Sequence, residues 1–465
     1  MHHQSNQEIK ILSPTAILGY GFPIESLEAG LAQKPDAIAV DAGSTDAGPY
    51  YLGLSVEEAM SQKGSFSQFV KRDLEPLLVS AVQNQIPLLI GSAGFAGGQI
   101  HLMGLIGLIH LIAEEHKLNF KLATINAEIE KSDVHEKLQA QQITSLVPNR
   151  QLTKEHIEDS TRIVGQMGVA PFVRALELGA DVVIAGRAND PSMFAALPIL
   201  KGFDMAQSIF MGKILECGAI AAEPGSGSDA LLATLRKDSF SVEPLNPNRA
   251  CTIQSIAAHA LYEKENPNIL VGPEGQIDLS QVKYTQESER RVRVSGATMA
   301  ASPSCTIKIE GARRVGYRAI AISAIRDRAM IRALDDSLQT AKSSFEKHFK
   351  VHRHPHFQVA FHVFGKEPGA TFMNREQAPL PGEVCLLMEC LGKTQADATS
   401  ACAWLRSHLL HMGFEGRFST AGNMAFPFSP ADIPTGPVFE FNIFDVMHDV
   451  DQNSLFPVQM STVEY

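Results

Sequence analysis

The sequence predicts an α/β fold in two domains: a mostly parallel, doubly wound sheet followed by an α+β domain of the ferredoxin-like βαββαβ type. A chain of 465 residues exceeds what a single hydrophobic core usually supports. From residue 8 to about 200, short β-branched runs alternate with longer amphipathic segments, and the last third follows a different order. We therefore expect one domain over residues 1–311 and a second over residues 312–465.

The first domain is predicted from six short apolar runs, each read as a strand. The runs are IKILSPTAIL (9–18), DAIAVDAG (36–43), IPLLIGSAG (86–94), FKLATINAE (120–128), RIVGQMG (162–168) and DVVIAGR (181–187). Residues 65–83, 99–116 and 170–178 carry apolar residues at helical spacing. Strands that alternate with helices favour a parallel sheet covered on both faces.

A further helix is expected over residues 204–223, ending at the loop PGSGSD, because Pro224 and the glycines after it disfavour helix. Residues 231–294 mix strand-like and helical pieces, so their topology is left open, with a cap over the sheet as one option. The basic stretch RRVRV at 290–294 is interpreted as a strand with a solvated face.

The second domain is predicted from six elements in the order βαββαβ. Strands are expected at 315–325, 357–365, 383–392 and 437–447, and helices at 326–349 and 394–412.

Composition narrows the class of partner and the compartment. The formal net charge of −11 argues against binding to a nucleic-acid backbone, which needs clustered basic residues. The N-terminus has no apolar signal region, and the longest apolar stretch, Leu102–Ile112, is too short to cross a bilayer. Six scattered cysteines without a CxxC pair fit reduced thiols. We expect a cytoplasmic protein that binds small molecules, neither nucleic acid nor membrane.

Polar or glycine-rich residues follow four of the predicted strands, whereas the opposite strand ends carry plain connectors. In an open parallel sheet, ligands bind outside the carboxyl ends of the strands, so these residues should share one rim. They are Asp41, Ser44, Thr45 and Asp46; Ser92, Gly94, Gly97 and Gly98; Asn126 and Glu128; and Arg187, Asn189 and Asp190.

The stretch GSAGFAGG joins a strand to the helix that starts near Gln99. Its glycines allow close approach of the backbone, and the helix N-terminus offers free N–H groups for a carboxylate or phosphate. It matches neither the dinucleotide fingerprint nor the P-loop, so no nucleotide cofactor is expected. The alternative is that the glycines only permit close packing of strand and helix.

The carboxylates of the rim could act as acid and base or as oxygen ligands of Mg²⁺ or another divalent cation. Asp46 is the tentative metal ligand, and Asp41, Asp46, His101 and Glu128 are the candidate catalytic residues. The alternative for Asp41 and Asp46 is an ordinary role in a turn.

Arg187 is the only obvious cation expected on the rim, and its planar guanidinium suits a substrate carboxylate. The alternative is a salt bridge to Asp190 or Asp46 that only fixes the loop. Asp190 precedes Pro191 and also reads as a helix N-cap. Glu216 could face the rim from its helix, whereas Cys217 is interpreted as a core residue.

Taken together, several motifs resemble the acyclic terpene utilisation AtuA-like family of bacterial proteins along nearly the whole chain. The motifs are DAGSTDAGPYYLG, IGSAGFAGG, GADVVIAGRAND, KILECGA, PNRACTIQSIAAHALYE, RVSG and FPFSPADIPTGPVFEFN. The resemblance implies a place in catabolism, where branched acyl-CoA thioesters are processed. The matching residues are Asp41, Ser44, Thr45, Asp46, Gly94, Gly97, Gly98, His101, Glu128, Arg187, Asp190, Glu216 and Cys217.

The chain departs from the family pattern at two positions near the rim. It has Asn126-Ala127-Glu128 where the family has His-Ser-Glu, and Gln99 where an aspartate is usual. Both changes remove ionisable groups, which leaves His101 and Glu128 as the remaining acid–base candidates.

The first hypothesis is a lyase of the hydratase or dehydratase type that acts on a small carboxylate or an acyl-CoA thioester. In it, Arg187 and the glycine loop orient the substrate. The second is a non-catalytic subunit that binds acyl-CoA or a carboxylate within a larger assembly. Homo-oligomerisation fits both, and a small partner subunit fits the second. A nucleotide-dependent ligase or kinase is a weaker third reading, because the P-loop lysine is missing.

Overall fold

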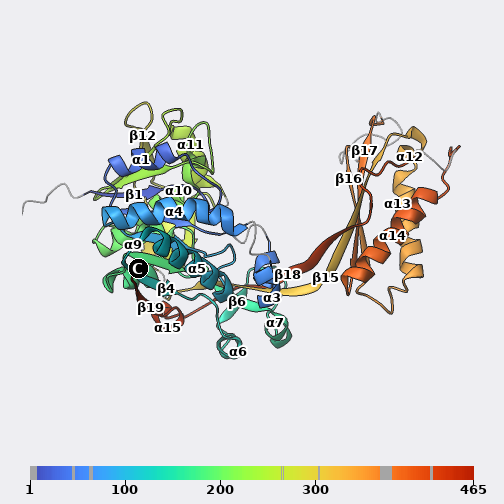
Figure 1. The fold of residues 1–465 in the computed structure, drawn as a ribbon, viewed down its shortest axis with the longest axis horizontal. Helices are drawn as coiled ribbons and strands as arrows, with labels where there is room; N and C mark the ends of the chain where they lie inside the picture. The colour runs from blue at the N-terminus through green and yellow to red at the C-terminus, as the bar shows by residue number, and fades with distance from the viewer. Residues whose placement is uncertain are drawn as a thin grey trace, which may run out of the picture. The chain divides into compact units, whose positions relative to one another are not determined.

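The computed structural model describes residues 8–43, 48–61, 66–262, 264, 266–301, 304–366, 380–418 and 423–465. The chain divides into two compact units (Figure 1). The first comprises Met1–Arg313 and Phe441–Tyr465, and the second comprises Arg314–Glu440. The second unit is thus inserted in the chain ahead of a C-terminal segment that belongs to the first.

A large sheet with strand order β12-β13-β9-β8-β1-β2-β3-β7-β4-β19 forms the centre of the first unit. Five neighbouring strands run parallel: β1 (Ile9–Ser13), β2 (Ala37–Asp41), β3 (Leu88–Gly91), β7 (Val182–Ala185) and β4 (Phe120–Ile125). Antiparallel strands flank them: β8 (Leu231–Leu235), β9 (Ser239–Pro244), β13 (Val292–Ser295) and β12 (Lys283–Gln286) on one side, and β19 (Val458–Val463) on the other. The predicted α/β class with parallel strands in a large sheet is confirmed, but the sheet is mixed rather than mostly parallel.

Helices pack on both faces of the parallel strands because alternate residues of each strand point to opposite sides. Ile38 and Val40 of β2 belong to the core cluster that also contains residues of α1 (Ile24–Ala32), α4 (Phe66–Asn84) and α5 (Gln99–His116). Ala37 and Ala39 belong to the cluster formed with α8 (Ala170–Glu177), α9 (Ser192–Leu200) and α10 (Met205–Leu215). The parallel strands are therefore buried on both faces, as their near-continuous apolar sequence indicates.

The helix predicted over residues 204–223 was too long. Helix α10 ends at Leu215, and a short 3-10 helix, η2 (Gly218–Ala221), follows. Gly218 has a φ of 55°, and a side chain there would meet the backbone of Asp229, Thr15 and Ala16. The close approach of that backbone turns the chain before Pro224, so Glu216 lies at the C-cap of α10.

The stretch left open in the sequence extends the sheet rather than capping it. Strand β13 confirms the interpretation of RRVRV, because Val292 and Val294 are buried and Arg293 is exposed. Along the chain, helix α11 (Ile253–Leu261) follows β9 and precedes a small antiparallel sheet with the strand order β10-β11-β14. These strands are β10 (Ile269–Gly272), β11 (Gly275–Asp278) and β14 (Thr298–Ala301).

The second unit is built from the later part of β15 (Ile307–Ile325), then α12 (Arg328–Arg332), α13 (Leu334–His348), β16 (Gln358–Phe364), β17 (Val384–Gly392), α14 (Gln395–His411) and the first part of β18 (Ile433–Met447). Its strands follow the order β16-β17-β15-β18. Phe345, Leu386 and Leu405 are fully buried in its core.

The ends of the two long strands belong to the first unit. There, Ile309–Ala312 of β15 pair antiparallel with β6 (Arg162–Gly165), and the end of β18 pairs with β5 (Ile143–Ser145). Strand β6, expected in the parallel set, pairs antiparallel with β15 instead.

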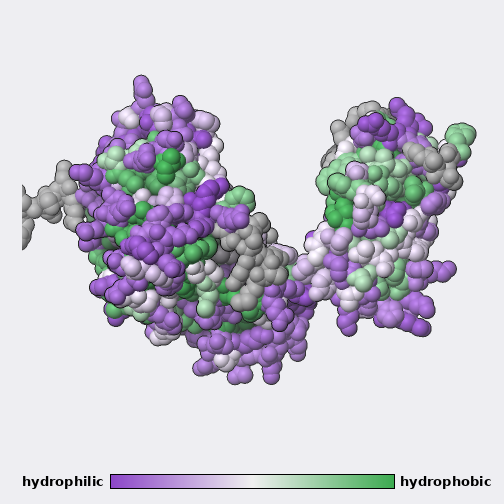
Figure 2. All heavy atoms as spheres, in the orientation of Figure 1, coloured by the Kyte–Doolittle hydropathy of each residue, from purple (hydrophilic) through white to green (hydrophobic). Residues whose placement is uncertain are grey.

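The remaining helices of the first unit are α2 (Tyr50–Gly53), α3 (Val56–Ser61), α6 (Lys131–Gln139), α7 (Lys154–Asp159) and α15 (Gln452–Leu455). Figure 2 shows a mostly hydrophilic surface over α6 and α7. Among the residues that the structure describes, no helix combines the length and apolar character needed to span a bilayer.

Candidate functional site

The ends of three neighbouring parallel strands bring Asp41, Ser92 and Arg187 together. Asp41 pairs in register with Gly91, and Ile90 pairs with Ile184, so β2, β3 and β7 end at one level. Asp41 is the last residue of β2, Ser92 comes directly after β3, and Arg187 comes two residues after the end of β7. This part of the predicted rim is therefore present.

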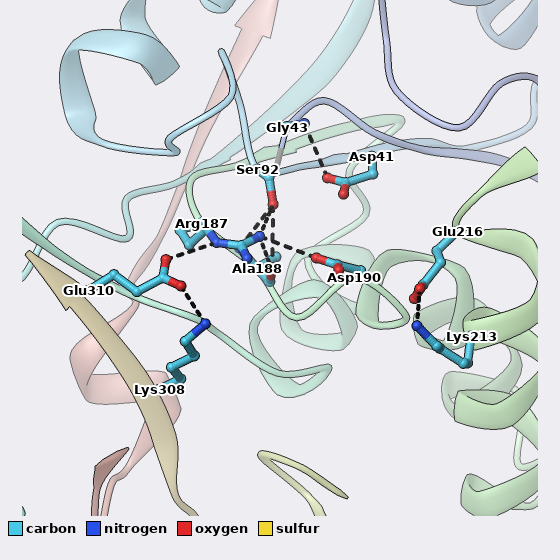
Figure 3. A network of polar contacts seen from close by, with 10 residues as sticks. All are labelled: Asp41, Gly43, Ser92, Arg187, Ala188, Asp190, Lys213, Glu216, Lys308 and Glu310. Atoms are coloured by element: carbon cyan, nitrogen blue, oxygen red, sulfur yellow. Dashed lines mark hydrogen bonds and ion pairs between the residues drawn. The ribbon is translucent and has the colours of Figure 1, made fainter. Parts of the chain in front are cut away.

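Arg187 lies at the centre of a buried polar network (Figure 3). Its Nη1 donates to the Ser92 hydroxyl at 3.0 Å, to the Ala188 carbonyl at 3.0 Å and to Asp190 at 3.2 Å. Its Nε donates to Glu310 at 3.2 Å. The arginine is 3% exposed, so these contacts hold its charge inside the protein.

Glu310, on β15, was not anticipated from the sequence. It is fully buried and accepts from Lys308 at 2.7 Å as well as from Arg187. Burial alone would raise its pKa, but the charges of Arg187 and Lys308 lower the pKa of Glu310 below its usual value. Burial likewise opposes the charge of Arg187, whose pKa is nevertheless raised by Glu310, Asp190 and Asp41. The network thus fixes both groups in their charged forms.

The pKa of Asp41 is shifted in the opposite direction to that of Glu310. Asp41 is 4% exposed, and its Oδ1 accepts a long hydrogen bond of 3.4 Å from the Gly43 backbone N–H. Burial, followed by the charge of Asp190, raises the pKa of Asp41 well above its usual value; Glu216 adds to the effect, and Arg187 and Ser92 oppose it. We conclude that Asp41 holds its proton far more readily than an ordinary aspartate.

Glu216 reaches the same region from the end of α10 (Figure 3). It is 5% exposed and pairs with Lys213 at 2.5 Å, one turn earlier on the helix. Its charge is one of the effects that raise the pKa of Asp41.

The glycine-rich loop packs tightly between two buried arginines. Gly97 has a φ of 65°, and a Cβ atom there would lie 2.1 Å from the backbone nitrogen of Arg187. At Gly98 a Cβ atom would lie 2.8 Å from Cδ of Arg162. Gly94, with a φ of 60°, lies against His101. Close packing, the alternative considered for these glycines, therefore accounts for all three.

The N-terminus of α5, predicted to hold a ligand anion, binds a carboxylate of the chain itself. Glu128, which follows β4, accepts from the Gln99 backbone N–H at 2.9 Å. The same carboxylate lies 3.9 Å from Nε of Arg162, and its side chain is 31% exposed. A negative charge at this position is favourable because the first turn of a helix has unpaired N–H groups.

Arg162 is a second buried cation that the sequence did not reveal. It is 6% exposed, and its Nη1 donates to the carbonyls of Leu52 and Leu54 at 2.6 and 2.7 Å. Burial lowers the pKa of Arg162, and the charge of Glu128 opposes that effect. Arg162 is the first residue of β6 and does not follow a strand, so the pattern of polar residues after strand ends does not include it.

His101 lies in the first turn of α5, beside this second arginine. Neither ring nitrogen makes a hydrogen bond of normal geometry to any part of the chain that the structure describes. Burial, followed by the charge of Arg162, lowers the pKa of His101 to about 4 against a smaller opposing effect of the Tyr51 backbone. The imidazole is therefore neutral near pH 7 and can accept a proton.

Two further predicted residues take part in local structure. The Asn126 side chain accepts from the Glu128 N–H at 3.0 Å, which shapes the turn after β4. Asn189 lies beside a small, largely apolar pocket formed with Pro191, Ile209 and Leu270, among others. Ser44, Thr45 and Asp46, three of the predicted site residues, lie outside the described residues.

Among the residues described, the rim side chains form no close group of three or more potential metal ligands. Asp190 is paired with Arg187, and Glu216 with Lys213. The one group of at least three suitable side chains in the described ranges is Glu75, Glu115 and His116, on the largely exposed surfaces of α4 and α5. Glu75 and His116 already pair there at 2.7 Å.

Comparison with known proteins identifies a family. The family model described as acyclic terpene utilisation family protein AtuA matches residues 31–427. That range contains every predicted site residue. No curated protein and no solved structure matches the chain.

Proposed function

This chain belongs to the acyclic terpene utilisation family, and on that premise we propose that it is a lyase of the hydratase or dehydratase type. Its substrate is a small carboxylate or an acyl-CoA thioester. Water is added or eliminated across a carbon–carbon bond next to the carbonyl group. Such chemistry needs one group that protonates the leaving hydroxyl and another that removes a proton from carbon.

The observation that carries the proposal is the buried carboxyl of Asp41 at the end of β2, beside Ser92 and Arg187, where burial raises its pKa. A carboxyl group with a raised pKa can act as a general acid near neutral pH. In dehydration, Asp41 donates its proton to the departing hydroxyl, and water leaves. In hydration, the resulting carboxylate takes a proton from the attacking water.

The second acid–base group is His101, because its imidazole is neutral at pH 7 and makes no hydrogen bond of normal geometry among the residues described. In dehydration it removes the proton from the carbon next to the carbonyl. Glu128, which the sequence suggested as an alternative, is held by the Gln99 N–H at the start of α5. We assign Glu128 the role of a positioning residue.

We propose that Arg162, rather than Arg187, orients the negative or polarised oxygen of the substrate. Arg187 is in contact with Glu310, Asp190 and Ser92, so its charge is already balanced. Arg162 contacts two neutral carbonyls, and within the described residues its one ion pair is the long contact of 3.9 Å to Glu128. A cation with one long ion pair gains more from a substrate carboxylate than one that already has two close ion pairs.

A divalent cation remains a prediction, since its tentative ligand, Asp46, lies outside the described residues. Mg²⁺ would stabilise the enolate-like charge that forms during such a reaction. Its test is activity after exhaustive chelation and again after addition of Mg²⁺.

The Asp41→Asn variant tests the proposal. Turnover is measured on a panel of β-hydroxy and α,β-unsaturated acyl-CoA thioesters and the matching free acids. We expect turnover of an accepted substrate to fall at least about 100-fold, because the amide cannot supply the proton. Asp36→Asn is the matched control, since Asp36 is an exposed residue just before the same strand. Full activity of Asp41→Asn on that substrate would refute the proposed role.

The alternative is a non-catalytic subunit that binds acyl-CoA or a carboxylate within a larger assembly. It draws support from the pairing of the rim charges, Arg187 with Glu310 and Lys213 with Glu216, which suits a pre-formed binding scaffold. The second unit, in a ferredoxin-like arrangement, would then dock a small partner subunit. Homo-oligomerisation fits both functions. Native mass spectrometry of the protein taken from its host distinguishes them, because a stable partner is expected only for the subunit.

A further inference from the structure

A cluster of ionisable side chains lies where α10 and α11 end. Lys213 and Glu216 come from the last turn of α10, His259 comes from the last turn of α11, and Tyr262 and Lys264 follow it. The His259 and Tyr262 rings stack with their centroids 5.1 Å apart. Glu216 connects the cluster to the rim through its effect on Asp41.

Lys264 differs from the other lysine of the cluster in having no ion pair with any residue that the structure describes. Its Nζ is buried and makes no hydrogen bond among the described residues, and it lies 5.9 Å from the centre of the Phe210 ring. The residue as a whole is only partly buried, although its amine is not exposed. A buried ammonium without a partner is costly, and a lysine in this position tends to lose its proton.

Lys213 supplies a fixed positive charge next to this amine. Its Nζ is held by Glu216 at 2.5 Å and lies 4.6 Å from the centre of the Tyr262 ring. Burial, followed by the charge of Lys213, lowers the pKa of Lys264 to about 8, and Glu216 opposes the effect. His259 adds no positive charge near pH 7, because its own pKa is lowered to about 4.

We propose that Lys264 is a nucleophilic amine that forms an imine with the carbonyl group of an aldehyde or ketone, at a site completed by Lys213, Glu216 and His259. An amine without a hydrogen-bond partner among the described residues, beside a second lysine, is an arrangement that activates lysine for this chemistry. The site goes beyond the proposed function and does not depend on proton transfer by Asp41.

The step balances without any further reagent. The neutral amine of Lys264 attacks the carbonyl carbon, and a carbinolamine forms. Its hydroxyl leaves as water after taking up a proton, and a protonated imine remains on the lysine. His259, which has an unpartnered Nε2 within the described part of the chain, can pass the proton during loss of water. Hydrolysis reverses each step.

Reductive trapping tests the proposal on the full-length protein. The protein is incubated at pH 7 with propanal and sodium cyanoborohydride, and the propylated lysines are located by peptide mass spectrometry. A lysine with a pKa of about 8 has on the order of a hundredfold more free amine at this pH than an ordinary lysine. We expect Lys264 to be labelled at least about tenfold faster than the exposed Lys237 and Lys283.

Two variants of opposite effect separate an activated amine from one that is merely accessible. Lys213→Met removes the charge that favours the neutral amine, so labelling of Lys264 should slow. Glu216→Gln removes the charge that favours the ammonium, so labelling should become faster. Thermal melting of each variant checks that the fold is retained.

Labelling of Lys264 no faster than that of Lys237 in the wild-type protein would overturn the proposal, whatever the variants do. Equal labelling in the two variants would also overturn it. Loss of turnover in Asp41→Asn has no bearing on this result, so the two proposals can fail separately.

Discussion

Two buried arginines lie on either side of the glycine pair of the rim, and their surroundings differ. Arg187, against Gly97, contacts the carboxylates of Glu310 and Asp190. Arg162, against Gly98, contacts two backbone carbonyls, and the carboxylate of Glu128 lies 3.9 Å from its Nε. They are 3% and 6% exposed, yet the pKa of Arg187 is raised and that of Arg162 is lowered.

The comparison shows that one buried arginine can have its charge neutralised by carboxylates of the protein, whereas another is bound mainly by neutral groups. The charge of Arg187 is matched inside the protein, so a substrate anion would compete with existing partners. The charge of Arg162 is stabilised mainly by dipoles, and its field acts on His101 next to it. We infer that the Arg187 network holds the strand ends in place, whereas Arg162, His101 and Glu128, here called the Arg162 cluster, make stability depend on pH.

The largest expected effect is on stability, from Glu310→Ala. The change leaves Arg187 and Lys308 without their shared buried partner, and breaking a buried pair in this way costs about 3–5 kcal/mol. Chemical denaturation measures the loss. The control is Glu177→Ala, which removes an exposed pair with Arg174 and should change stability by less than about 0.5 kcal/mol. A loss of the same small size for Glu310→Ala would contradict a structural role for the Arg187 network.

The next largest effect is a pH dependence of stability that arises from His101 beside Arg162. The pKa of His101 is about 4 in the folded protein and about 6.5 when unfolded, so the unfolded state binds more protons between these values. The contribution of His101 is complete above pH 6.5 and is lost as the pH falls toward 4. As the pH falls from 6.5 to 4, we expect the free energy of unfolding to decrease by about 3 kcal/mol more in the wild-type protein than in His101→Gln.

Denaturation curves between pH 4 and pH 7 measure this difference. The wild-type protein is the reference, because His259, which has a similarly lowered pKa, and the carboxylates contribute equally to both proteins. If the two stability curves run parallel, the imidazole of His101 is not held neutral by Arg162 and by burial.

The smallest effect is expected for Glu128→Gln. The change removes a charge near the first turn of α5 and 3.9 Å from Arg162. Because the side chain is 31% exposed, solvent screens it, and we expect a loss of about 0.5–1 kcal/mol that shrinks in high salt. Glu130→Gln is the control on an exposed neighbour. A loss above about 2 kcal/mol would place Glu128 with the buried Arg187 network instead.

The strand ends of the rim could be predicted because they depend on local patterns. The alternation of apolar runs with helices located β2, β3, β4 and β7, and the helix over residues 99–116 agrees with α5. Asp41, Ser92 and Arg187 meet because parallel strands end at one edge. Arg162 and Glu310 could not be found in this way, since β6 and β15 pair antiparallel with each other, and that pairing joins segments far apart in sequence.

The sequence by itself determined the α/β class, the family and the positions of the parallel strands, because periodicity and motifs are properties of adjacent residues. Only the tertiary structure decided which charges meet. In the tertiary structure Arg187 forms an ion pair with Glu310, and Glu128 binds the N-terminus of α5, which was expected to bind a ligand. Lys264 has no hydrogen-bond partner among the described residues. The reason is that pairing inside a protein depends on distance and burial, which arise from contacts between distant segments.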